Sequence, residues 1–193
     1  MPLKNHRPLR IGFDLDGVLL YNPARIFRPV TMSLKHILPK KNSNQKINFY
    51  YPKSHPEKIM WRIVHWSSLF IAKGVDQIYD LVKRKKIEAY IVTSRYDCLK
   101  TDFNEWLKKL NKDAIFQACY HNKNDLQPHI FKEQKINELK LDYFVEDNYD
   151  IVKHINATTD ASCIWITNLF DQHIGYEPKF LNLKDAMNYI KKL

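Results

Sequence analysis

The chain has 193 residues, of which 45% are hydrophobic and 27% are charged, a composition typical of a folded globular domain and unlike that of a disordered chain. Its 31 Lys and Arg outnumber its 21 Asp and Glu, and the net charge of +10 indicates either an anionic partner, such as a phosphate ester or nucleic acid, or a general surface bias. Three widely spaced cysteines without a C-x-x-C pair argue against a disulfide framework or a zinc site and favour a cytoplasmic location.

No apolar segment is long enough to suggest a membrane protein. The first eight residues lack the hydrophobic stretch of a signal peptide. The longest apolar stretch, 59–72, is interrupted by Arg62 and His65 and is too short and too polar to cross a bilayer. We therefore expect no membrane association.

Apolar runs that predict strands alternate along the chain with amphipathic patterns that predict helices. This alternation is typical of an α/β fold with a mostly parallel central sheet covered by helices on both faces. Strands are expected over 9–13, 87–92, 114–120, 141–145 and 162–166, and helices over 75–84, 99–110, 130–139, 151–156 and 180–193.

The alternation stops between residues 21 and 72, where prolines break the chain and helices are expected over 30–38 and 57–70. This segment carries nine Lys or Arg and one acid, so its net charge of +8 is most of the total. We interpret 21–72 as a small basic helical cap, inserted into an α/β core formed by 1–20 and 73–193. In this cap Trp61 and Trp66 are expected on a packing face, with stacking of one of them on a substrate base as the alternative.

Polar side chains follow three of the predicted strands. Asp14 and Asp16 come directly after the first strand, 93–95 (Thr-Ser-Arg) after the second, and 146–148 (Glu-Asp-Asn) after the fourth. Ligands of parallel sheets bind beyond the carboxyl ends of the strands, so we expect these clusters to meet in one crevice. Two carboxylates so close together indicate a divalent cation or a proton-sharing pair.

Four segments, in order along the chain, resemble the four motifs of the haloacid dehalogenase (HAD) superfamily. They are FDLDGVL from Phe13, IVTSR from Ile91, the lysine Lys135 ahead of strand 141–145, and FVEDN from Phe144. The insert lies where this superfamily places a small helical cap, and the arrangement is similar to that of the deoxyribonucleotidase (5'-nucleotidase) group. The resemblance implies a Rossmann-like HAD core and phosphoryl-transfer chemistry.

For the first motif, the resemblance implies that Asp14 is a nucleophile that forms an aspartyl-phosphate. Asp16 would be the general acid for the leaving oxygen and then the base for the attacking water, with its proton affinity raised by the neighbouring carboxylate. Gly17 would let the backbone adopt an unusual turn and approach the phosphate closely.

For the acidic motif, the resemblance implies a Mg²⁺ site. Its ligands would be the Asp14 carboxylate, the backbone carbonyl of Asp16 and Asp147. Glu146 stands where an aspartate is commoner in the superfamily, and we assign it a water-mediated or supporting role.

The other two motifs would supply phosphate contacts. Thr93 is preferred as the donor to a phosphoryl oxygen, with Ser94 as the alternative, and Lys135 is preferred over Lys132 as the cation of the transition state. Arg95 is assigned either to the substrate or to a salt bridge at a helix start.

The expected function is Mg²⁺-dependent hydrolysis of a small phosphomonoester, with nucleoside 5'-monophosphates as the leading candidates. Two alternatives stay open. The basic insert favours a phosphatase acting on nucleic-acid ends, although aromatic residues are not concentrated there. The glutamate at 146 would also suit a catalytically idle binding or regulatory protein. Neither the oligomeric state nor the substrate can be predicted from these patterns.

Overall fold

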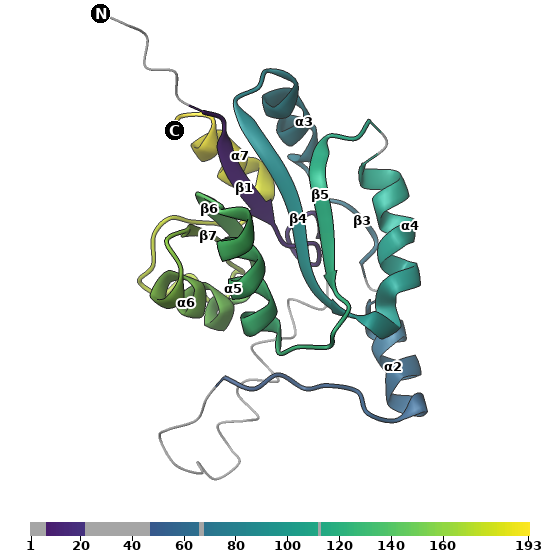
Figure 1. Cartoon of the computed structure of the whole chain (residues 1–193). Coiled ribbons are helices and arrows are strands. Elements are labelled where there is room, and N and C mark those ends of the chain that lie inside the picture. Colours follow the sequence, from purple (N-terminus) through teal and green to yellow (C-terminus); the bar gives the residue numbers. More distant parts are fainter. Residues whose placement is uncertain (1–6, 22–46, 66–67, 112) are drawn as a thin grey trace, which may run out of the picture.

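The computed structural model describes residues 7–21, 47–65, 68–111 and 113–193, which form a central sheet with helices on both faces (Figure 1). Six strands run parallel in the order β5-β4-β1-β6-β7-β8. This arrangement confirms the predicted α/β class. The strands are β1 (Leu9–Phe13), β4 (Ile87–Tyr96), β5 (Phe116–Asn122), β6 (Tyr143–Glu146), β7 (Ser162–Ile166) and β8 (Lys179–Phe180).

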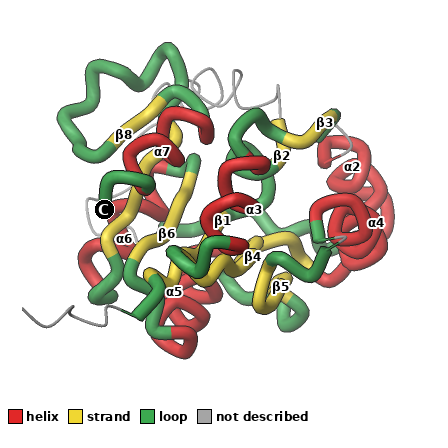
Figure 2. The backbone as a smooth tube through the Cα atoms, turned by 90° about the horizontal axis from the view of Figure 1, so that it is seen from above, coloured by secondary structure: helices red, strands yellow, loops and turns green. Residues whose placement is uncertain are grey.

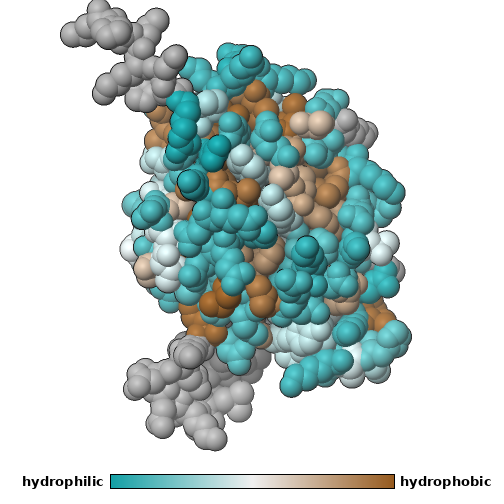
Figure 3. Space-filling view, viewed as in Figure 1, coloured by the Kyte–Doolittle hydropathy of each residue, from teal (hydrophilic) through white to brown (hydrophobic). Residues whose placement is uncertain are grey.

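The helices divide between the two faces of the sheet, as the view from above shows (Figure 2). On one face lie α3 (Val75–Lys83), α4 (Lys100–Leu110) and α7 (Leu183–Ile190), whose buried side chains belong to one apolar core. On the other face α5 (Pro128–Leu139) and α6 (Tyr149–Thr158) contribute to a second core. The face shown in Figure 3 is largely hydrophilic, with scattered apolar groups, as is usual for a folded domain.

Strand β1 lies in the middle of the sheet and serves both cores. Alternate residues of a strand point to opposite faces of the sheet. Ile11 and Phe13 therefore share one face, and both are fully buried in the first core. Gly12, between them, faces Leu141 and Phe144, and a Cβ at this glycine would lie 2.5 Å and 2.7 Å from their side-chain carbons. The second core therefore packs directly against the backbone of β1.

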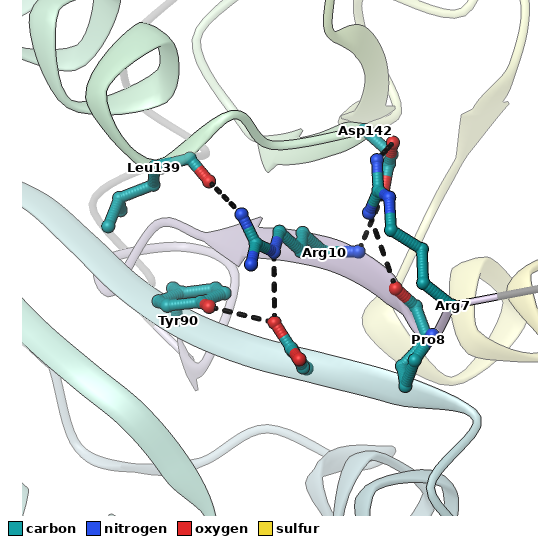
Figure 4. A network of polar contacts seen from close by, with 7 residues as sticks. Arg7, Pro8, Arg10, Tyr90, Leu139 and Asp142 are labelled. Atoms are coloured by element: carbon teal, nitrogen blue, oxygen red, sulfur yellow. Dashed lines mark hydrogen bonds and ion pairs between the residues drawn. The ribbon is translucent and has the colours of Figure 1, made fainter.

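A polar network ties the amino end of β1 to its two neighbours (Figure 4). Asp142, before β6, accepts hydrogen bonds from the Arg7 guanidinium at 2.7 and 2.9 Å and from the backbone N–H of Arg10 at 2.8 Å. The Arg10 Nε donates to Glu88 of β4 at 3.0 Å, and the Tyr90 hydroxyl donates to the same carboxylate. These contacts hold the strand register at the end of the sheet opposite Asp14.

The insert begins and ends in a two-stranded antiparallel ribbon, β2 (Leu20–Tyr21) with β3 (Phe70–Ile71). The rings of Tyr21 and Phe70 stack across it at 4.8 Å. The helix expected over 57–70 is α2 (His55–His65), and its predicted end was wrong because Phe70 pairs as a strand. The helix expected over 30–38 and the side chain of Trp66 lie outside the described residues, and the division into core and cap stays a prediction.

The other predicted boundaries differ by a few residues. Strand β4 continues past Val92 to Tyr96, whose ring is buried, and the last helix is shorter than 180–193 because Phe180 belongs to the edge strand β8. Among the helices that the structure describes, we find none with the length and apolarity needed to cross a bilayer.

Candidate active site

The three polar clusters that follow the strands meet at one pocket, as expected. Strand β1 ends at Phe13, and the backbone N–H of Asp14 donates to Val145 of β6 at 3.0 Å, which places Asp14 at the carboxyl edge of the sheet. A cavity of about 230 Å³ opens there. The predicted residues that line it are Asp14, Asp16, Thr93, Ser94, Arg95, Glu146, Asp147 and Asn148.

Gly17 provides the turn that the sequence predicted. Its φ of 86° lies in the left-handed region, which glycine adopts without strain. Its N–H donates to the carbonyl of Leu20 at 2.9 Å, and Leu20 donates back to Leu15 at 2.8 Å. This tight loop carries the chain from the first acidic motif into β2.

An acidic cluster lies at the base of the pocket. Carboxylate oxygens of Asp14, Glu146 and Asp147 lie within 4.8 Å of one another, and all three side chains are buried. Among the described residues, the ammonium that enters this cluster is that of Lys132, 3.1 Å from Asp14 Oδ1 and 2.5 Å from Glu146 Oε2. Two of the three buried carboxylates, those of Asp14 and Glu146, thus contact one buried lysine.

Burial and mutual repulsion raise the proton affinity of this cluster. Burial, reinforced by Asp147 and Asp16, raises the pKa of Asp14 to about 6 although Lys132 opposes the shift. Burial likewise raises the pKa of Glu146 to about 8. Burial lowers the pKa of Lys132, but its contacts with Asp14 and Glu146 outweigh that effect and leave it above the ordinary value.

The cluster has the donor set of a magnesium site. Mg²⁺ prefers carboxylate oxygens and is bound in proteins by a few of them together with water. Asp14, Glu146 and Asp147 offer three such oxygens in one buried place, with more negative charge than Lys132 neutralises. The residues present therefore fit Mg²⁺, and Glu146 is one of the candidate ligands, although its role had been expected to be indirect.

The structure corrects the choice of lysine. Lys135 lies one turn further along α5, where its Nζ donates to Glu138 at 2.6 Å and lies 4.7 Å from the centre of the Tyr120 ring. It does not line the pocket. Lys132, which had been ranked second, takes the buried position beside Asp14 because it is on the side of α5 that faces the sheet.

Asp16 does not share a proton with Asp14. Its Oδ1 accepts hydrogen bonds from Arg95 Nη2 and Ser68 Oγ, and its Oδ2 accepts one from Arg95 Nε, each at 2.7 Å. Burial alone would raise the pKa of Asp16, but the Arg95 guanidinium outweighs it and holds the pKa well below the ordinary value. The expectation of a raised proton affinity was therefore wrong for this conformation, and Arg95 forms a salt bridge.

Thr93 and Ser94 both line the pocket. Thr93 is almost fully buried, and its Oγ1 accepts a hydrogen bond from the backbone N–H of Arg95 at 3.3 Å, while Ser94 is partly exposed. This geometry keeps both as candidates for contact with a phosphoryl oxygen.

Several pocket residues come from the insert, and sequence reasoning missed most of them. Phe49, Tyr50 and His65 line the pocket together with Trp61, for which stacking had been an alternative. Ser68, the donor to Asp16, was also missed. The sequence hint for the aromatic residues is only that three of them stand together at 49–51. Nothing in the sequence distinguishes Ser68 from any other serine near a short strand.

Comparison with known proteins identifies the fold. Neither the family models nor the curated proteins match this sequence. Among solved structures, the HAD hydrolase YfnB of Bacillus subtilis, bound to magnesium, matches with a TM-score of 0.61 and 12% identity over 96% of this chain and all of its own. CbbY of Rhodobacter sphaeroides in complex with phosphate matches with a TM-score of 0.56 and 12% identity over 92% of this chain and 95% of its own.

A HAD-superfamily hydrolase of Ehrlichia chaffeensis matches with a TM-score of 0.52 and 16% identity over 97% of this chain and 98% of its own. These neighbours do not support the predicted relationship to the deoxyribonucleotidase group in particular. Their identities are low, so the likeness concerns the fold, and it extends over nearly the whole chain. This protein has the fold of the HAD-superfamily hydrolases.

Proposed function

We propose that this protein is a Mg²⁺-dependent phosphatase that hydrolyses a small phosphomonoester through an aspartyl-phosphate on Asp14. The observation that carries the proposal is the buried cluster of Asp14, Glu146, Asp147 and Lys132 at the carboxyl edge of the sheet. Burying several charged side chains costs free energy unless they form ion pairs or bind a metal ion. The HAD hydrolase fold of the neighbours supports the same chemistry.

Asp14 is the nucleophile of the proposal, because its carboxylate lies at the strand end and lines the cavity. Asp14, Asp147 and Glu146 would hold Mg²⁺, with the Asp16 carbonyl as a further candidate ligand. Bound there, Mg²⁺ would offset the charge of the phosphoryl group and orient it. Lys132 neutralises developing charge beside Asp14, and Thr93 or Ser94 donates a hydrogen bond to a phosphoryl oxygen.

Asp16 is the proposed acid and base of the two steps. In the described conformation it is held as a carboxylate by Arg95 and Ser68, the form that accepts a proton from the water of the second step. Protonating the leaving oxygen in the first step requires Asp16 to leave Arg95 and to take up a proton from water, which it then donates to that oxygen. Both Gly17 and Arg95 stay close to the bound phosphate in this proposal.

The substrate is a small phosphorylated compound, and we propose nucleoside 5'-monophosphates as the first class to test. The cavity is small, about 230 Å³, and its wall includes aromatic side chains of the insert. One neighbour, CbbY, has been solved in complex with phosphate and, as a mutant, with xylulose-1,5-bisphosphate, so small phosphorylated ligands are bound on this fold.

The decisive test is phosphate release from a panel of phosphomonoesters with Mg²⁺ and with EDTA. We expect turnover only with Mg²⁺, and none in Asp14→Asn. Lys132→Met should lower kcat by roughly 10²- to 10³-fold, the usual cost of removing one preorganised charge-stabilising donor. Lys135→Met, three residues away on the same helix, should stay within about twofold of wild type. Turnover that survives Asp14→Asn would disprove the proposal.

A further inference from the structure

The return limb of the insert is fastened to the core by side chains outside the acidic cluster. We call residues Phe49–Tyr51 the strap. Its backbone is held by Gln127, whose Oε1 accepts from the Phe49 N–H at 2.7 Å and whose Nε2 donates to the Phe49 carbonyl at 3.3 Å. One amide side chain therefore satisfies both backbone groups of Phe49, as a neighbouring strand would.

Gln127 is placed for this contact by its position in the fold. It is the residue immediately before α5, where a short polar side chain that caps the helix is usual. Gln127 makes no such cap, and its amide is turned to the strap instead. The preceding loop is braced by Asn122, fully buried, which exchanges two hydrogen bonds with the backbone of Leu126 at 2.6 and 2.9 Å.

Two more contacts fix the rest of the strap. The Tyr51 hydroxyl donates to Asp125 Oδ2 at 2.8 Å, and Asp125 Oδ1 accepts from the backbone N–H of Asp97. The Tyr96 hydroxyl donates to the carbonyl of Tyr50 at 3.2 Å, and its ring meets that of Tyr51 edge-on at 5.0 Å. Each strap residue thus bonds to the core.

The strap presents aromatic rings to the pocket. Phe49 and Tyr50 line the cavity, and the ring of Tyr50 lies 5.6 Å from that of Trp61 on α2. Aromatic groups held in place by other residues form a contact surface without a further loss of conformational freedom on binding. The cavity therefore has an acidic base at the strand ends and an aromatic wall formed by Phe49, Tyr50 and Trp61, with the Phe49 ring packed 5.9 Å from that of His129 on α5.

We propose that Gln127 is a positioning residue for this wall, and that the wall selects phosphomonoesters whose leaving alcohol carries a flat ring. The inference rests on the proposed function, because it assigns the wall to the leaving-group side of the same site. Gln127 acts through Phe49 and Tyr50 and makes no contact with the reacting atoms.

The test compares benzyl phosphate with butyl phosphate, two primary alkyl esters whose leaving alcohols have similar acidity. We expect wild-type kcat/KM to favour benzyl phosphate by roughly threefold to tenfold, the range of a single aromatic contact. Gln127→Met should raise KM for benzyl phosphate and reduce the preference to near one, with kcat almost unchanged. Gln134→Met, an exposed glutamine on the same helix, is the matched control and should keep the wild-type preference.

Binding of the non-hydrolysable analogues 2-phenylethylphosphonate and pentylphosphonate, measured by calorimetry with Mg²⁺, separates this inference from the proposed function. A preference for the phenyl compound without any turnover would support the wall and contradict the phosphatase proposal. Turnover with equal kcat/KM and equal binding of both compounds would overturn the inference alone.

Two further measurements exclude a merely structural effect of Gln127. Hydrogen exchange at the Phe49 amide should accelerate in Gln127→Met and not in Gln134→Met. Tyr50→Leu changes an exposed side chain, so the fold is not at risk, and it should also lower the ring preference. An equal loss of kcat/KM for both esters in Gln127→Met, or an unchanged preference in Tyr50→Leu, would contradict the assignment.

Discussion

Arg95 controls the state of Asp16 more strongly than the neighbouring Asp14 does. Its guanidinium binds both oxygens of the Asp16 carboxylate, and both side chains are nearly excluded from water, with 1% and 12% exposed. A bidentate pair in such a place keeps both charges because each satisfies the other. The two carboxylates of the first motif therefore have different environments: Asp16 is paired with Arg95, and Asp14 lies beside Lys132.

At the residue scale we predict that Arg95→Met destabilises the protein by about 3–5 kcal/mol at pH 7, because it leaves a buried carboxylate without its partner. Arg95 lowers the pKa of Asp16, so the pair stabilises the fold above the unfolded pKa of about 3.9 and loses that contribution as the pH falls further. The difference in the free energy of unfolding between Arg95→Met and the wild type should therefore become smaller from pH 7 to pH 3.

Urea unfolding at both pH values measures this difference. Arg84→Met is the control, because its ion pair with Asp80 is largely exposed and should contribute less than about 1 kcal/mol. A loss of stability in Arg95→Met that is the same at both pH values would contradict the assignment to Asp16.

The choice between Lys132 and Lys135 shows where residue-scale prediction fails. The sequence spacing favours Lys135, but a helix decides which side chain points inward, and the apolar residues of α5 do not form a clear stripe that reveals its phase. Only packing against β4 and β6 shows that Lys132 faces Asp14. By contrast, Asp14 and Asp147 could be located because each follows directly on an apolar strand.

At the element scale, β1 depends on a glycine that is not in a turn. Gly12 lies mid-strand, where glycine is usually unfavourable, and its missing Cβ lets Phe144 pack against the backbone. The Phe144 ring is fully buried and has no room to withdraw. The close approach is compatible with the parallel pairing of β1 with β6, and that pairing brings Asp14 and Asp147 to one edge of the sheet.

We predict that Gly12→Ala lowers the free energy of unfolding by about 1–3 kcal/mol, the usual cost of overpacking a core. Gly175→Ala is the matched control, because a Cβ at that glycine would meet nothing within 4 Å. Urea denaturation of the two variants checks the prediction. A tolerated Gly12→Ala would mean that Leu141 and Phe144 can move aside.

Apolar runs located five of the six strands of the main sheet, and the errors concern short or polar segments. The two-residue strands β3 and β8 offer too little pattern, and β8 lies at the sheet edge. Strand β4 continues beyond its apolar run because Thr93 and Tyr96 pair with β5 and because Arg95 is buried against Asp16, which comes from another part of the chain. In a sequence pattern a polar residue predicts the end of a strand. In the structure the strand can continue through that residue when a residue far away in the sequence pairs with its side chain.

At the scale of the whole molecule, the acidic cluster links stability to pH and, in the function that we propose, to Mg²⁺. Burial raises the pKa of Asp14 to about 6 and of Glu146 to about 8, so in the folded, metal-free protein these groups keep protons that the unfolded chain releases near pH 4. Since the folded state then binds more protons, the stability that this cluster contributes falls as the pH rises from about 4 to about 8.

We therefore predict that 10 mM Mg²⁺ (roughly 100 times an assumed Kd of about 0.1 mM) raises Tm little at pH 5 and by roughly 5 °C at pH 8, because the metal replaces the protons. Differential scanning fluorimetry at matched ionic strength measures both shifts. Asp147→Asn should abolish most of the shift at pH 8. A Mg²⁺ shift that is independent of pH would mean that the cluster is already ionised without metal.

The narrow ribbon of β2 and β3 has a consequence for how such proteins diversify. Tyr21 and Phe70, where the chain leaves and rejoins the core, lie side by side with stacked rings. No strand of the main sheet lies between these two residues, so exchanging the segment would leave the pairing of β1 with β4 and β6 unchanged. In the phosphatase that we propose, recombination at this junction would therefore replace the aromatic wall of the pocket and leave Asp14 and Asp147 at the edge of the main sheet.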